Sequence, residues 1–118
     1  MAYDEELAER VRDALADRPV REQKMFGGLA FMVDDRMVVC VGAGGGALLV
    51  RVSPDDDAEL VQRQGAARGQ MGAGRSMGTG WIAVDEQAVA SEEDLDVWMA
   101  AALAFHADQA GREKPKRR

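Results

Sequence analysis

The chain has 118 residues, one cysteine, one histidine and a formal net charge of −6. This length suits one domain with one modest core, and a single cysteine with a single histidine excludes an internal disulfide, a zinc cluster and a CxxC redox pair. No apolar run approaches the roughly 20 residues of a membrane-spanning helix, and the N-terminus is acidic where a signal peptide is basic, so we expect a cytoplasmic protein with no metal, cofactor or membrane partner.

The N-terminal half predicts a helix followed by strands. The apolar spacing indicates an amphipathic helix over residues 3–16, with Asp4 as its N-cap and Arg18-Pro19 as its stop. Three β-type segments follow, at residues 21–26, 29–33 and 37–41. Asp34-Asp35-Arg36 separates the last two segments and is typical of a hairpin turn.

The C-terminal half predicts two more strands and two more helices. Strands are expected at residues 47–52 and 81–84, and a helix capped by Ser53 is expected to run to about residue 64. Residues 65–80 contain six glycines, which favour a mobile loop. The last helix begins at Ser91 and presents one apolar face to the sheet, made of Leu95, Trp98, Met99, Ala102 and His106.

These elements predict an α+β fold. The short connections favour an antiparallel meander, because parallel strands need a long crossover. We therefore expect a two-layer sandwich, with a sheet of about five strands and the helices packed on one face. The domain is expected to span residues 1–110, and residues 111–118 are expected to form a basic, disordered tail.

Cys40 is the strongest candidate nucleophile, yet its valine neighbours supply no base or cation that would activate the thiol. His106 could meet it across the interface between helix and sheet, but a histidine on the apolar face of a helix is more often packed. The carboxylate clusters lie at turns and helix starts, and the glycine runs match no phosphate-binding motif. We therefore predict no catalytic residue.

Two segments are candidates for contact with a partner or ligand. The first surrounds a glycine pair and the only lysine of residues 1–111, and the second is the glycine-rich segment with the tryptophan that follows it. Mobile loops that carry arginine and methionine suit adaptable recognition. The predicted contact residues are Lys24, Met25, Phe26, Gly27, Gly28, Arg68, Arg75, Met77 and Trp81.

The combined pattern resembles the N-terminal domain of the TfoX/Sxy family. The resemblance rests on Lys24-Met25-Phe26-Gly27-Gly28 before an apolar hairpin, the GALLVRV strand at residues 46–52, Met77 with Gly80-Trp81, and the final helix. It implies a bacterial regulatory protein linked to natural competence, acting as a coactivator beside a cyclic-AMP-responsive transcription factor. Full-length family members carry a second, helical domain. The resemblance covers nearly all of this chain and leaves no room for that domain, so we expect a stand-alone N-terminal domain here.

The leading hypothesis is therefore a noncatalytic adaptor whose partner is another protein, with the transcription machinery as its candidate source; monomer and homodimer both stay open. One alternative is nucleic-acid association through Arg68, Arg75 and the tail, whose cations are Arg112, Lys114, Lys116, Arg117 and Arg118. Residues 112–118 hold five basic residues and one acidic residue, which leaves ten basic and twenty acidic residues, or −10, in residues 1–111. The negative charge of residues 1–111 repels a phosphate backbone, so these residues are not expected to bind nucleic acid nonspecifically. The other alternative is a small enzyme or ligand-binding protein with a pocket between the glycine-rich loop and the sheet.

Overall fold

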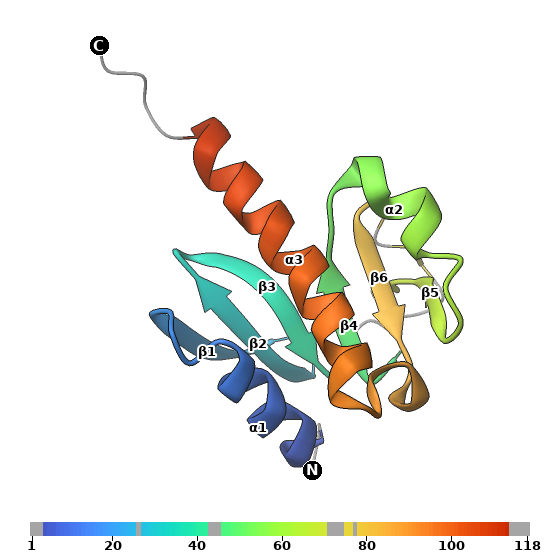
Figure 1. Ribbon diagram of the computed structural model, residues 1–118, viewed down its shortest axis with the longest axis horizontal. Helices are drawn as coiled ribbons and strands as arrows, with labels where there is room; N and C mark the ends of the chain where they lie inside the picture. The colour runs from blue at the N-terminus through green and yellow to red at the C-terminus, as the bar shows by residue number, and fades with distance from the viewer. Residues whose placement is uncertain (1–3, 26, 43–45, 71–74, 77, 114–118) are drawn as a thin grey trace.

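Figure 1 shows the computed structural model, which describes residues 4–25, 27–42, 46–70, 75–76 and 78–113. The elements in chain order are α1 (Glu5–Ala14), β1 (Val20–Met25), β2 (Gly28–Val33), β3 (Arg36–Val41), β4 (Leu48–Arg51), α2 (Pro54–Leu60), β5 (Ala66–Arg68), β6 (Trp81–Val84), the short 3₁₀ helix η1 (Glu86–Val89) and α3 (Glu92–Glu113).

In the described residues, one antiparallel sheet contains all six strands, in the order β1-β2-β3-β4-β6-β5. The predicted α+β sandwich is confirmed, with six strands in place of about five. The added strand is β5, which lies inside the segment predicted as a loop. The edge strands are β1 at one end of the sheet and β5 at the other.

The predicted helix starts and the acidic hairpin turn are confirmed. Asp4 accepts hydrogen bonds from the backbone N–H groups of Glu6 and Leu7, and Ser53 and Ser91 accept comparable bonds at α2 and α3. Asp34 and Asp35 have φ values of 54° and 66° between the paired residues Val33 and Arg36. Positive φ at both central residues matches the twist of a two-residue hairpin turn.

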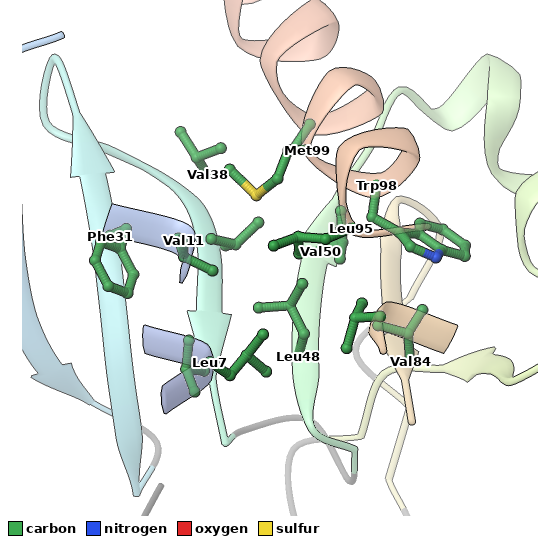
Figure 2. Close-up of a cluster of buried hydrophobic side chains, with 14 of the residues drawn as sticks. Leu7, Val11, Phe31, Val38, Leu48, Val50, Val84, Leu95, Trp98 and Met99 are labelled. Carbon is green, nitrogen blue, oxygen red and sulfur yellow. The ribbon is translucent and has the colours of Figure 1, made fainter. Parts of the chain in front are cut away.

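The main core lies between the helices and one face of the sheet, here called the helix-covered face. Figure 2 shows side chains from α1, α3 and the strands meeting there. All five residues predicted on the buried face of α3 are buried, including Trp98 and Met99. The buried residues labelled in Figure 2 are Leu7, Val11, Phe31, Val38, Leu48, Val50, Val84, Leu95, Trp98 and Met99.

The opposite side of the sheet, here called the second face, carries a smaller apolar cluster. Its buried members are Ala30, Cys40 and Leu49, and the half-buried side chains around them are Met32, Met37 and Trp81. None of these six residues belongs to a helix. In the described residues, this cluster is therefore formed by strand residues alone.

The prediction that residues 65–80 form a loop without regular structure is wrong at Ala66–Arg68. These residues pair with β6 from Ala66↔Val84 to Arg68↔Ile82. Alanine and glycine have low strand propensity, so the local sequence does not predict a strand here. The strand forms because pairing with β6 satisfies the backbone hydrogen-bonding groups of this segment. Residues 71–74 and 77 lie outside the described residues.

Helix α3 continues through Glu113, so it includes the first three residues of the expected tail, 111–113, and residues 114–118 lie outside the described part of the chain. Within that part, no helix combines the length and the apolar character that a membrane crossing requires.

Candidate functional site

The glycine pair of the first predicted contact segment closes the β1–β2 hairpin. Met25 and Gly28 are the last paired residues, and Gly27 has a φ of +80°. A Cβ added at Gly28 would overlap the backbone carbonyl oxygen of Val41 in β3. The backbone therefore requires glycine at both positions: Gly27 adopts a left-handed conformation, and Gly28 lies where two strands approach closely. Phe26, although predicted as a contact, lies outside the described residues, as does the side chain of Met25.

Lys24 is exposed on the edge strand β1. It pairs with Leu29, whose side chain belongs to the main core, so Lys24 extends along the helix-covered face at the rim of the sheet. Glu22 lies two residues away on the same face, where Nε and Nη2 of Arg12 in α1 donate to its carboxylate at 2.5 and 2.9 Å. Lys24 therefore remains available as a contact residue.

Arg68, predicted as a contact residue, takes part in an internal network. Its guanidinium donates to both carboxylate oxygens of Asp57 in α2, with Nη2 2.7 Å from Oδ2, and also to the carbonyl oxygen of Gly78 at 3.2 Å. The backbone N–H of Gly80 donates to Asp57 Oδ1 at 2.8 Å. This network joins α2, β5 and the turn before β6.

The Asp57 carboxylate is buried, with 5% of its side chain exposed. The hydrogen bonds from Arg68 hold its pKa below the usual carboxyl value, and they outweigh burial, which acts to raise it. The Arg68 guanidinium thus stabilises the charged form of the Asp57 carboxylate, which gives Arg68 a structural role.

The other predicted residues of this segment differ in their surroundings. Arg75 is exposed, whereas Met77 lies outside the described residues. Trp81 is half-buried on the second face, and the guanidinium of Arg51 lies over its ring at 4.7 Å and near Phe105 of α3 at 5.5 Å. Arg51 thus forms a cation–π contact that the sequence pattern did not reveal.

The two predicted contact segments lie at opposite ends of the sheet. Lys24 is in β1 and Arg68 is in β5, which are its two edge strands. They do not form a single site. The second face extends between them, with Met32, Met37 and Trp81 as its half-buried apolar side chains.

Cys40 and His106 are held apart by the sheet. Cys40 is buried on the second face, where burial raises the pKa of its thiol to about 11. His106 lies on α3 above the other face, and its Nε2–H donates to the carbonyl oxygen of Val33 at 2.9 Å. Asp34 Oδ2 is 3.6 Å from the same nitrogen. Both residues pack as the sequence predicts, without contact between thiol and imidazole.

A polar depression of about 580 Å³ lies at the start of the glycine-rich segment. It is on the helix side, between the turn after α2, η1 and α3, rather than between the loop and the sheet. The residues that line it include Arg63, Asp85, Asp94 and the buried Trp98. Of the cations of the alternative nucleic-acid site, Arg68 is bound to Asp57 and Arg75 is exposed. The side chain of Arg112 is not described, and Lys114, Lys116, Arg117 and Arg118 lie outside the described residues.

Comparison with protein families places the chain beside one domain family. The family model described as the TfoX N-terminal domain matches residues 4–106, which include every strand and most of α3. No curated protein and no solved structure matches the chain.

Proposed function

Because the chain belongs to the TfoX N-terminal domain family, we propose that it is a noncatalytic regulatory module that binds another protein of the transcription machinery in the cytoplasm. The family match over residues 4–106 is the observation that carries this proposal. The separation of Cys40 from His106 by the sheet supports it, because a buried thiol whose pKa is raised to about 11 is a poor nucleophile at neutral pH. The regulated process that fits the family is natural competence.

We further propose that the partner binds the second face. Met32 and Met37 are directly paired across β2 and β3, and Trp81 lies on the same face in β6. Methionine side chains adapt to irregular apolar surfaces, and tryptophan is enriched where interfaces bind most tightly. A protein that presents an apolar patch is therefore the expected partner.

Affinity capture from native extract, with and without nuclease, tests both proposals. We expect one protein to be retained regardless of nuclease, and we expect Met37→Glu to reduce its recovery because a carboxylate would be buried in an apolar interface. Val97→Glu is the matched control, since Val97 is an exposed apolar residue of α3 on the helix side.

Three results would contradict the proposals. Recovery of nucleic acid alone would favour the nucleic-acid alternative. Equal retention by Met37→Glu and the wild-type chain would exclude the second face as the binding surface. Copurification of one small molecule that raises the melting temperature would favour a ligand-binding protein.

A further inference from the structure

The outer edge of β1 is the longest open strand edge that the structure describes. In the described residues β1 pairs only with β2, and the register runs without a bulge from Val20↔Val33 to Met25↔Gly28. No proline interrupts residues 20–25. A regular edge of this kind presents unpaired N–H and C=O groups to another strand.

The other edge of the sheet is less suited to pairing. Strand β5 has only three residues, and Gly69 follows it directly. Its neighbouring residues Gln70 and Ser76 are joined by an isolated bridge within the same segment. An added strand would find twice the length of regular edge at β1.

We propose that β1 pairs in antiparallel fashion with β1 of a second copy of this chain, about a two-fold axis at Gln23. The two six-stranded sheets would then become one continuous sheet. In this register Gln23 faces Gln23 of the second copy, and Glu22 faces Lys24 of the second copy twice, once on each side of the axis.

Charge favours this register over its neighbours. Moving the axis to Glu22 would place two Glu22 carboxylates opposite each other, and moving it to Lys24 would place two Lys24 ammonium groups opposite each other. Opposite charges across a strand pair are stabilising and like charges are destabilising. The register centred on Gln23 is the one that pairs Glu22 with Lys24.

The faces of the two sheets also agree in this register. Glu22 and Lys24 both lie on the helix-covered face, as their pairing with Phe31 and Leu29 shows. The helices of both copies would thus lie on one side of the joined sheet. The Glu22 carboxylate is already held at the rim by Arg12, so the approaching Lys24 meets a fixed acceptor.

A charge-exchange experiment tests the pairing. The single substitution Glu22→Lys would place two ammonium groups opposite each other, and the single substitution Lys24→Glu would place two carboxylates opposite each other. Each variant should therefore dimerise about tenfold more weakly than the wild-type chain. An equimolar mixture of the two variants restores pairs of opposite charge in a heterodimer. Sedimentation velocity of each variant and of the mixture measures the effect, and circular dichroism verifies that each variant is folded.

Cysteine trapping tests the register. Gln23→Cys should form an intermolecular disulfide under mild oxidation, because directly opposed residues have Cα atoms about 5 Å apart. Arg21→Cys is the control, because in this register its counterpart is four residues away along the strand. The native Cys40 is buried and does not compete.

The proposal is supported if the wild-type chain dimerises, the mixture alone recovers the dimer among the charge variants, and cross-linking is specific to Gln23→Cys. A wild-type chain that is monomeric at every concentration tested would overturn it. So would dimerisation that both charge variants retain, or faster cross-linking of Arg21→Cys than of Gln23→Cys.

Discussion

At the scale of single residues, Gly27 and Gly28 show how a sequence motif becomes geometry. The expectation from the sequence is that two glycines allow a positive φ or a bulge, and the structure assigns positive φ to Gly27 alone. The need for glycine at Gly28 comes from β3, which approaches closely after a further hairpin has formed. That contact is made between strands, so the local sequence could not show it.

Replacement by alanine should separate the two glycines. Gly28→Ala should lower the free energy of unfolding by about 3 kcal/mol, because its Cβ would overlap the Val41 carbonyl oxygen and force the strands apart. Gly27→Ala meets open space and should cost about 1 kcal/mol of left-handed backbone strain. Urea denaturation measures both, and equal losses would contradict the assignment.

The thiol of Cys40 should be inert in the folded chain. Because burial raises its pKa to about 11, almost no thiolate forms at pH 8, and the side chain has no exposed surface. Ellman's reagent should therefore react only after denaturant is added. Since the folded pKa lies above the unfolded value, this group contributes stability at neutral pH and loses it as the pH rises toward 11. Rapid labelling without denaturant would refute the packing role.

At the scale of elements, the network of Asp57 and Arg68 joins β5 to α2. The sequence presents Asp55, Asp56 and Asp57 as three equivalent acids at a helix start, where dipole and capping account for all of them. Asp57, however, lies three residues before Leu60, on the side of α2 that packs against the core. An acid on the apolar side of a helix indicates a buried partner, and this signal could have identified Arg68.

Removing Arg68 should destabilise the chain more than removing another arginine nearby. Arg68→Met leaves the buried Asp57 carboxylate with only the Gly80 N–H as a described donor, and should cost about 2–3 kcal/mol. Arg75→Met, in the same segment and exposed, should change the free energy of unfolding by less than about 0.5 kcal/mol. Comparable losses in the two variants would show that the network carries no stability.

The same pair predicts an acid dependence. The pKa of Asp57 is lower in the folded chain than in the unfolded chain, so its contribution is complete above the usual carboxyl pKa of about 3.9 and is lost as the pH falls through the folded value. Asp57→Asn should therefore show a smaller fall in melting temperature between about pH 5 and pH 3 than the wild-type chain. Parallel curves for the two proteins would argue against the depressed pKa.

At the scale of the whole molecule, alternating apolar residues and turn chemistry were enough to predict the α+β sandwich. The acidic hairpin and the buried face of α3 also followed from local patterns. The relative positions of the two contact segments could not be predicted, because strand order depends on long-range pairing. The insertion of β6 between β4 and β5 places the second segment at the edge opposite Lys24.

The distribution of charge predicts weak and tail-dependent binding to nucleic acid. Removing residues 114–118 takes away four basic residues and changes the net charge from −6 to −10. If the full chain binds duplex DNA at low salt, this deletion should abolish the binding. The slope of the logarithm of the binding constant against the logarithm of the salt concentration should be no steeper than about −4, because four cations release about that many counterions. Filter binding over a salt series measures this slope. Retention by the truncated chain would show that the acidic body itself binds DNA.

The position of β6 in the sheet also constrains how the chain folds during synthesis. A ribosome releases β4, α2 and β5 before β6, yet β6 is the strand that joins β4 to β5. Helix α3, which buries Leu48 and Val50, emerges later still. The nascent chain therefore carries exposed apolar strands until most of its residues have left the ribosome, and surfaces of this kind are prone to aggregation.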